Sequence, residues 1–390
     1  MVAPSDLQII YPFSETLPLK KARAIQYLKT CHALAEAGIR VHAIFGKDPS
    51  LSDTDCLAWY GLKPHPNLTL WRLPILRKKE GGRGISWNGL FNIFCIRKIR
   101  SLVKAGVPSV LFLRHLKLAH HLVKKGIVND IPTIFEAHEV FSTTTERTGS
   151  RQKLREMEAS VFGAARMVVS ISQGLKAGLQ REFQLKSDLP VIPDGADIPR
   201  SAAVRKPEEG NICYTGHLYP WKGVDTLVKA MAHLPDARLT IVGGEAGDIQ
   251  RLRSLGTELK VEARIHFEGW VAPEKVAGYL ERAQVAVVPL GTDVIASHFT
   301  SPLKLFEYMA AGVPVVASDL PSVREVLTDG VNAVLVRPDD PKALAEGVQK
   351  LLADRSLANR LATRALDDVR QYSWSSRAEK IRLVAGSILG

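Results

Sequence analysis

The sequence predicts an α/β fold with two doubly wound domains, on three observations. Short apolar runs alternate with helical patterns along the whole chain, as in parallel sheets that are covered by helices. The 390 residues suffice for two domains at roughly 150 residues each. The alternation pauses at residues 199–210, which are rich in proline, alanine and charge, so we place a linker there.

Each apolar run is interpreted as a buried parallel strand, and the helical patterns between the runs as crossovers. The strands expected in the first half are residues 7–11, 41–45, 68–73, 109–113, 133–136, 167–171 and 190–193. Those in the second half are residues 212–216, 238–242, 265–269, 285–289, 313–318 and 333–336. Helices are expected at residues 19–37, 87–104, 151–164, 222–234, 302–311 and 341–352. The predicted domains are therefore residues 1–198 and 199–371, followed by a C-terminal helix in residues 372–390 that packs on either domain.

The composition is that of a globular protein of a reducing compartment. Its four cysteines are scattered and form no CxxC pair or Cys/His cluster, which predicts neither a zinc site nor a disulfide framework. The first residues show no basic stretch before an apolar one, so no signal peptide is expected. No apolar run is long enough to span a bilayer. We expect a cytoplasmic protein.

The net charge of +12 lies in the first half of the chain. Residues 1–195 contain 28 Lys and Arg against 16 Asp and Glu, whereas residues 196–390 contain 24 of each. A charge that serves only solubility would not be expected to divide this way. The first half is therefore expected to face an anionic partner: a membrane, an acidic lipid-linked substrate or nucleic acid. No helix-turn-helix, zinc finger or base-stacking motif accompanies the charge, which argues against nucleic acid.

The most informative segment is residues 301–318, SPLKLFEYMAAGVPVVAS. Ser301 and Pro302 suit the N-cap and the first position of a helix, whose free N–H groups and dipole favour a phosphate. Lys304 and Glu307 are three residues apart and share a face near that end. Glu307 could accept hydrogen bonds from ribose hydroxyls. On spacing alone, a surface Lys–Glu pair on an amphipathic helix explains the pattern equally well.

A second segment is residues 214–225, YTGHLYPWKGVD. A strand is expected to end at Gly216, and Lys222 and Gly223 to open a helix after a loop. A glycine at the end of a strand lets a ligand approach the backbone closely, and a lysine across the loop can neutralise a diphosphate. A plain strand–loop–helix turn is the alternative, because a lone glycine–lysine pair is weakly specific.

Together the two segments are far more specific, and the chain resembles the family 4 retaining glycosyltransferases over essentially its whole length. Similar stretches are VIPDGAD at residues 191–197, VGG at 242–244, IHFEGWV at 265–271 and the start of the last helix at 372–374. The resemblance implies the GT-B fold, in which two Rossmann-like domains face each other across a cleft. It also implies an acceptor-binding first domain, a second domain that binds a nucleoside-diphosphate sugar, and a last helix that crosses back toward the first. The segment SPLKLFE is similar to a subgroup with a Pro-x-Lys-x-x-Glu helix.

The resemblance assigns roles to individual residues. Lys222 would bind the donor diphosphate and stabilise the leaving group, and Glu307 would hold the ribose. His138, in the stretch FEAHEV, matches the family's active-site histidine near the donor sugar, whereas spacing alone favours a structural histidine. The expected catalytic residues are thus His138, Lys222 and Glu307. The expected donor-binding residues are Gly216, His217, Lys222, Ser301, Leu303, Lys304 and Glu307.

Four positions depart from the family pattern. Phe299 stands eight residues before Glu307, where the family usually has a glutamate, and His217 stands in place of an arginine. Asp194 replaces the asparagine of the turn between the domains. Residues 12–19, PFSETLPL, replace the N-terminal glycine-rich loop.

These departures leave alternatives open. Asp293 and His298 are the neighbouring candidates to replace the missing glutamate. A non-catalytic nucleotide-sugar-binding protein is a second hypothesis. A sugar-nucleotide epimerase, which shares the fold but needs no basic acceptor half, is a third. For the transferase we expect no metal and no other cofactor, because the resemblance implies a retaining family that usually works without one, and a front-face reaction, since no carboxylate is clearly placed as a nucleophile.

Residues 71–104 combine many arginines and lysines with tryptophan, phenylalanine and isoleucine. A basic segment with exposed aromatic residues suits an anionic membrane surface, which would fit a lipid-linked acceptor and a peripheral position on the inner face of the membrane. Equally, the apolar residues belong to the core and the charges to a solvated face, because an amphipathic helix serves both purposes.

Overall fold

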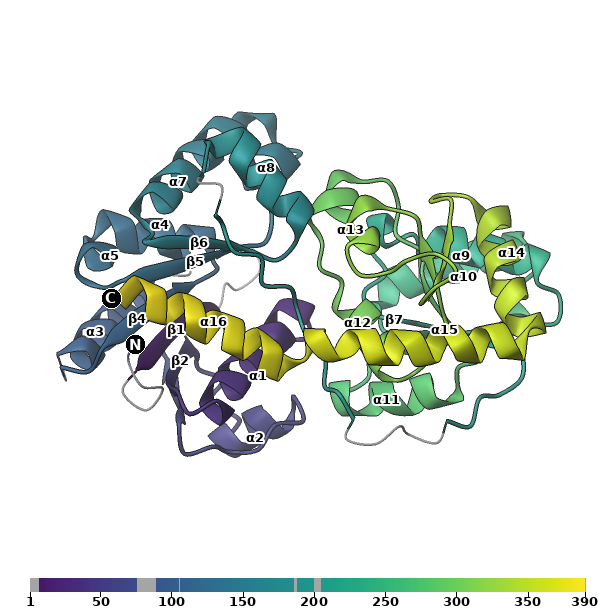
Figure 1. Ribbon diagram of the computed structural model, residues 1–390, viewed down its shortest axis with the longest axis horizontal. Helices are drawn as coiled ribbons and strands as arrows, with labels where there is room; N and C mark the ends of the chain where they lie inside the picture. The colour runs from purple at the N-terminus through teal and green to yellow at the C-terminus, as the bar shows by residue number, and fades with distance from the viewer. Residues whose placement is uncertain (1–6, 76–88, 105, 186–187, 200–204, 390) are drawn as a thin grey trace. The chain divides into compact units, whose positions relative to one another are not determined.

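The computed structural model describes residues 7–75, 89–104, 106–185, 188–199 and 205–389. It contains two parallel six-stranded sheets with their helices (Figure 1), which confirms the predicted two-domain α/β fold. The chain divides into a first unit, residues 1–171, 175–193 and 374–390, and a second unit, residues 172–174 and 194–373.

The sheet of the first unit has the strand order β3-β2-β1-β4-β5-β6, and every pairing is parallel. Its strands are β1 (Gln8–Thr16), β2 (Arg40–Gly46), β3 (Leu68–Leu73), β4 (Ser109–Leu113), β5 (Thr133–Ala137) and β6 (Met167–Ser170). Its helices are α1 (Ala22–Glu36), α2 (Asp53–Ala58), α3 (Gly89–Val103), α4 (Leu116–Lys124), α5 (Ile127–Asp130), α6 (Phe141–Thr144), α7 (Arg151–Ala164), α8 (Gln173–Phe183) and α16 (Trp374–Leu389), with a 3-10 turn at Thr148–Ser150.

The second unit repeats this order as β12-β11-β10-β7-β8-β9, again with parallel pairings throughout. Its strands are β7 (Asn211–Thr215), β8 (Arg238–Val242), β9 (Ile265–Gly269), β10 (Val285–Val288), β11 (Val315–Ser318) and β12 (Val334–Val336). Its helices are α9 (Val224–Ala230), α10 (Ala246–Glu258), α11 (Pro273–Arg282), α12 (Leu303–Ala310), α13 (Pro321–Arg324), α14 (Pro341–Ala353) and α15 (Arg355–Asp368). Short turns lie at Pro220–Lys222, Met231–His233, Glu262–Arg264, Ile295–Phe299 and Val369–Tyr372.

Both sheets are buried on two faces, as parallel sheets require. In the second unit, Ile212 and Tyr214 of β7 enter one apolar cluster, while Cys213 between them enters another. Such alternation places successive side chains on opposite faces of the sheet. In sheets of this order, ligands bind at the carboxyl ends of the strands, where the order reverses between β1 and β4 and between β7 and β10.

Several predicted elements differ from the structure, and part of another lies outside the described residues. The strand predicted at residues 7–11 continues to Thr16, with a register shift after Phe13. Residues 190–193 form one isolated bridge, between Ser170 and Val191, instead of a strand. The helix predicted from residue 222 begins at Val224 because Gly223 adopts a left-handed conformation. The first two residues of the helix predicted at 87–104 lie outside the described residues.

The C-terminal helix α16 packs against α1 of the first unit (Figure 1). Its buried face includes Trp374, Arg377, Ala378, Ile381, Ala385 and Ile388. Nowhere in the described ranges is a helix both long enough and apolar enough to cross a membrane.

Candidate functional site

The loop that follows β7 is shaped by two glycines. Gly216 has a φ of +116°, and a Cβ at this position would lie 3.1 Å from Nζ of Lys304. Gly223 has a φ of +69°, and a Cβ there would lie 1.6 Å from the carbonyl oxygen of Pro289. Only glycine suits both positions, because other residues rarely adopt these angles and the space is already occupied.

Helix α12 is fixed to the end of β7 by a buried tyrosine. The hydroxyl of Tyr308 accepts a hydrogen bond of 2.7 Å from the backbone N–H of Thr215. Gly216 follows directly, so the glycine turn and the first residues of α12 lie close together. The two segments that the sequence singles out therefore meet at the carboxyl end of β7, where a ligand is expected in this fold.

Lys222 is half-buried in the turn that precedes α9. Its Nζ lies 3.7 Å from the centre of the Trp221 ring. Burial lowers the pKa of Lys222 to about 7. Burial removes water from the ammonium group and so disfavours its charged form. An anion bound beside the group would favour the charged form again.

Lys304 is more deeply buried, with 8% of its surface exposed. Its Nζ lies 3.6 Å from the centre of the Tyr214 ring and has no hydrogen-bond partner among the described residues. Burial and then the charge of Lys222 lower the pKa of Lys304 well below its ordinary value, and Glu307 opposes this shift. The alternative of a surface Lys–Glu pair is therefore wrong, because the lysine points into the unit toward Gly216. A buried polar group without a partner is costly, which suggests a ligand that supplies one.

The start of α12 differs from the prediction. The helix begins at Leu303, which is half-buried, with Pro302 as the N-cap and no side-chain capping bond. The predicted N-cap role of Ser301 is wrong, because its Oγ accepts a hydrogen bond of 3.0 Å from the backbone N–H of Asp194. The proline at the N-cap leaves the first N–H groups of the helix without a side-chain acceptor of this kind. Phosphate binding at Leu303 and Lys304 remains a prediction.

Two further predicted residues lie on either side of the lysines. Glu307 is half-buried one turn into α12, near enough to raise the pKa of Lys304. His217 follows Gly216 and stacks on Tyr219, with ring centres 5.0 Å apart and planes 10° apart. The structure therefore brings Gly216, Lys222, Lys304 and Glu307 to one place in the second unit, with His217 on the adjoining loop.

The candidates for the missing glutamate have other contacts. Phe299 is buried at the end of a π-helical turn, Ile295–Phe299, and belongs to the packed interior. Asp293 is exposed, and its Oδ1 accepts a hydrogen bond of 2.8 Å from the N–H of Ile295 at the start of that turn. His298 is exposed, and its carbonyl oxygen accepts a hydrogen bond of 3.2 Å from Ser172 Oγ. Which of the two side chains replaces the glutamate stays open.

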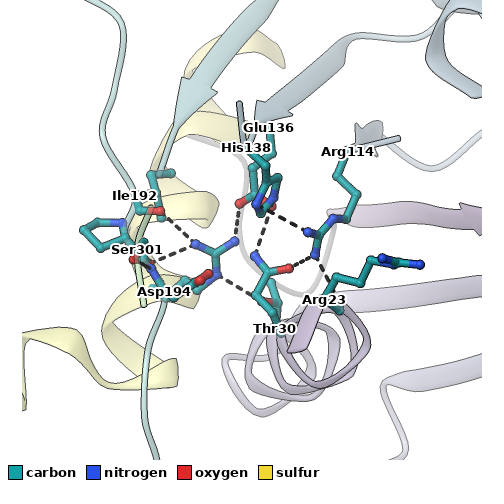
Figure 2. Close-up of polar contacts among 11 residues, drawn as sticks. Arg23, Thr30, Arg114, Glu136, His138, Ile192, Asp194 and Ser301 are labelled. Atoms are coloured by element: carbon teal, nitrogen blue, oxygen red, sulfur yellow. Dashed lines mark hydrogen bonds and ion pairs between the residues drawn. The ribbon is translucent and has the colours of Figure 1, made fainter. Parts of the chain in front are cut away.

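In the first unit, His138 lies directly after β5 in a buried polar cluster (Figure 2). Its Nε2 lies 2.8 Å from Oε2 of Glu136, and its Nδ1 lies 3.3 Å from Nη2 of Arg114. A guanidinium only donates, so the tautomer that satisfies both contacts carries its proton on Nε2 and accepts at Nδ1. Burial, reinforced by Arg114 and opposed by Glu136, lowers the pKa of His138 to about 4. The imidazole is therefore neutral at neutral pH.

Arg114, Gln26 and Arg377 also belong to this cluster, although none of them is among the predicted site residues. Arg114 is buried and donates to His138, to the Gln26 side chain and, over 3.1 Å, to the carbonyl oxygen of Arg23. Gln26 donates to Glu136 Oε2 over 3.1 Å. For Arg114 a signal was present, since it follows directly after β4 at the carboxyl edge of the sheet. Gln26 and Arg377 lie on the buried faces of helices and carry no local signal.

The described part of the basic segment contains both core and surface residues. On α3, Phe91, Cys95 and Ile99 are buried, whereas Ile93 is 51% exposed. The basic residues Arg97 and Arg100 are exposed on the same helix, and the exposed Lys104 follows directly after it. Also on α3, Lys98 places its Nζ 3.5 Å from the centre of the ring of Trp71 in β3. Residues 76–88 of this segment lie outside the described residues.

Comparison with known proteins gives consistent matches over both units. The family model described as Glycosyltransferase Family 4 matches residues 25–200, and the model described as Glycosyl transferases group 1 matches residues 209–354. A phosphatidyl-myo-inositol mannosyltransferase of Mycobacterium tuberculosis is 32% identical over 336 residues, which cover 80% of this chain and 84% of the relative. The chain spans only 51% to 59% of the length of three other curated relatives.

Solved structures show the same fold at low sequence identity. Sucrose-phosphate synthase from Thermosynechococcus elongatus has a TM-score of 0.75 and 22% identity, with 98% of both chains covered. An Anabaena protein, HepE, in complex with UDP and glucose has a TM-score of 0.72 and 16% identity, with 97% of this chain and 99% of the other covered. Both are similar to this chain in fold alone. From the two family models and the mycobacterial relative together, the chain belongs to the family 4 glycosyltransferases.

Proposed function

We propose that this protein is a retaining glycosyltransferase of the hexosyl type. In this proposal it moves a sugar from a nucleoside-diphosphate sugar to a sugar or lipid-linked acceptor, in glycolipid or cell-surface polysaccharide synthesis. The observation that carries the proposal is the buried Nζ of Lys304, without a hydrogen-bond partner among the described residues and close to Gly216. Family membership favours a transferase over the epimerase.

Two similar proteins support the donor and the acceptor. The Anabaena structure contains UDP and glucose, the parts of a nucleotide sugar. The mycobacterial relative is named as a mannosyltransferase that acts on phosphatidyl-myo-inositol, which is a lipid. We therefore propose a donor of the nucleoside-diphosphate type and an acceptor of the same general class, and leave the sugar, the base and the acceptor to experiment.

The proposed reaction makes and breaks one bond to the anomeric carbon. The bond from this carbon to the diphosphate oxygen breaks, and a bond to the acceptor oxygen forms on the same face of the sugar. Negative charge grows on the departing diphosphate, so ammonium groups held beside it lower the barrier. In this proposal Lys222 and Lys304 supply that charge, and no metal takes part. The acceptor's proton passes to the departing diphosphate.

The two remaining catalytic candidates have different roles in this proposal. Glu307, one turn into α12, would hold the ribose of the donor. His138 would contact the donor sugar as a neutral imidazole. Because both of its ring nitrogens are already engaged, by Glu136 and Arg114, we do not assign it the role of general base.

A donor screen tests the proposal. The purified protein is incubated with common UDP-, GDP- and ADP-sugars and a cell lipid extract, with and without EDTA, and release of free nucleoside diphosphate is measured. We expect release from one donor, unaffected by EDTA and lost in Glu307→Ala. Lys260→Ala, an exposed lysine of the second unit, serves as the matched control for general damage to that unit. A protein that binds a nucleotide sugar but never releases the diphosphate would be a non-catalytic binding protein.

We further propose that α3 attaches the first unit to an anionic membrane surface. Its exposed residues combine Ile93 with Arg97 and Arg100, the exposed Lys104 follows directly after the helix, and such a surface gains from both apolar and electrostatic contact with acidic lipid. At low salt, the protein should co-sediment with vesicles that contain phosphatidylglycerol. Charge reversal in Arg97→Glu/Arg100→Glu should weaken this binding by about tenfold or more.

The control for this experiment is Arg360→Glu, which reverses one exposed arginine of α15 in the second unit. It should leave vesicle binding close to that of the unchanged protein. Equal binding by all three proteins would contradict the role of α3, and absence of binding to acidic vesicles at low salt would contradict membrane attachment itself.

A further inference from the structure

We propose that Arg377, on the C-terminal helix α16, is a positioning residue for His138: acting through Glu136, it fixes the orientation and the tautomer of the histidine ring. The inference rests on the proposed function, in which His138 contacts the donor sugar. Arg377 lies 241 positions after Glu136 in the chain, yet the two side chains form an ion pair inside the first unit. The side chains of both are 1% exposed.

The guanidinium of Arg377 has a partner on each of its three nitrogens. Nη2 donates to Oε1 of Glu136. Nη1 donates to the carbonyl oxygens of Ile192 and Pro193, over 2.8 and 2.9 Å. Nε donates to Oγ1 of Thr30 on α1, over 3.0 Å. These bonds hold the planar guanidinium against α1, β5 and residues 192–193. A lysine cannot make all of these contacts together.

Glu136 divides its two oxygens between Arg377 and His138. Oε1 accepts from Arg377, while Oε2 accepts from Nε2 of His138 over 2.8 Å and from Gln26 over 3.1 Å. As long as Glu136 is ionised and held in this rotamer, the histidine must keep its proton on Nε2. Nδ1 then accepts from Arg114, so the ring is held at both nitrogens.

Arg377 also keeps Glu136 ionised. Burial alone would raise the pKa of this carboxyl group, but the charge of Arg377, followed by contributions from His138 and Arg114, holds it well below its usual range. Without Arg377, the carboxylate loses its strongest stabilising charge and is free to rotate or to take up a proton. Either change removes the acceptor that orients His138.

The electrostatic surroundings of His138 predict the direction of the change. The charged or titratable groups that face it or its partner are Tyr11 on β1, Glu136 on β5, Arg377 on α16, and Arg114 and His115 in the loop between β4 and α4. Of these, Arg114 and Arg377 disfavour the imidazolium, whereas Glu136 favours it. Loss of the Arg377 charge therefore raises the pKa of His138 from about 4 toward its ordinary value, provided Glu136 remains ionised.

The test compares Arg377→Gln with the unchanged protein by NMR of the full chain labelled with ¹⁵N-histidine, with His138→Ala used to assign the signal. We expect the pKa of His138 to rise by roughly one unit, or its Nε2–H tautomer to be lost. With the donor identified by the screen, we expect kcat to fall by about tenfold or more, because the ring is misplaced, and the donor KM to stay within about twofold. A mere loss of stability would leave the titration of His138 in the folded fraction unchanged.

The matched control is Arg382→Gln on the same helix, where the arginine pairs with Glu379 at the surface. It should change neither the titration of His138 nor kcat. Arg377→Lys keeps the charge, so the pKa of His138 should stay near that of the unchanged protein while kcat falls less than in Arg377→Gln. If Arg377→Gln does not fold, Arg377→Lys decides: a kcat reduced by about threefold or more supports the proposal, and an unchanged kcat overturns it.

A folded Arg377→Gln protein in which His138 keeps its pKa and tautomer would overturn the proposal. Failure of the proposed function is a separate outcome. If the unchanged protein releases no nucleoside diphosphate from any donor, the transferase proposal fails, while the NMR titration still shows whether Arg377 controls His138.

Discussion

Replacement of Lys222 by alanine is expected to lower kcat/KM for the donor by about 10²- to 10³-fold, the usual cost of removing a preorganised group that stabilises charge in the transition state. The side chain lies in a turn that ends at Gly223, over the ring of Trp221, and among the described residues no charged group contributes to its pKa shift beside burial. The substitution should therefore leave folding intact. Steady-state kinetics over a range of donor concentrations measures the effect.

The pH dependence of the unchanged protein gives an independent check on Lys222. Its pKa of about 7 means that the free protein loses the ammonium charge as pH rises through about 7. Since the cationic form stabilises the departing diphosphate, kcat/KM should fall above this pH, and the fall should be absent in Lys222→Ala. Lys229→Ala, an exposed lysine of α9, is the matched control. Kinetics of Lys222→Ala within twofold of the unchanged protein would remove this residue from the site.

Replacement of His138 by alanine is expected to lower turnover by about 10²-fold without unfolding the protein. The ring lies at the carboxyl edge of the first sheet and is held by Glu136 and Arg114. Under the proposed function, its loss would remove an oriented contact with the sugar. Thermal unfolding followed by circular dichroism distinguishes this from a folding defect. His121→Ala, a half-buried histidine of α4, should retain activity. Unchanged turnover in His138→Ala would assign the residue a structural role only.

The titration of His138 affects stability as well as activity. Its pKa is lowered from the ordinary value of 6.5 to about 4 in the folded protein, so the unfolded chain binds the proton more readily. The contribution of the neutral His138 ring to the free energy of unfolding is therefore fully present above pH 6.5. It is lost as the pH falls through about 4. In the same way, activity that requires the neutral ring should persist through pH 6 and decline only near pH 4.

Much of the fold follows from the alternation of apolar runs and helical patterns. The bounds of β3, β4, β8, β9 and α7 agree with the prediction residue for residue, because each is a run bounded by turn residues or charge. The prediction is wrong where the backbone conformation of one residue sets the start of an element. The left-handed Gly223, for example, makes α9 begin at Val224 instead of at residue 222. Ser301 was misassigned because its hydroxyl bonds to Asp194, a contact 107 positions away that no local pattern reveals.

The candidate site was only partly predictable for a related physical reason. Spacing places Lys304 and Glu307 on one helix face, but it does not show which way that face points, and the structure turns Lys304 inward over Tyr214. The cluster around His138 depends on Arg114 and Arg377, which come from distant elements. Such groups meet only after the sheet has formed and α16 has packed on α1.

Calorimetric titration with UDP, GDP and ADP tests most directly whether the second unit binds a diphosphate with the half-buried Lys222 and the buried Lys304. The titrations are repeated at pH 7.5 in two buffers of different ionisation enthalpy, with Lys304→Met and the matched control Lys229→Met. Burial lowers the pKa of both Lys222 and Lys304, so binding of a diphosphate should draw roughly one proton or more from the buffer. We predict that one nucleoside diphosphate binds with this proton uptake, and that Lys304→Met binds more weakly and takes up fewer protons. Equal binding by all proteins without proton uptake, or no binding of any nucleoside diphosphate, would contradict the account.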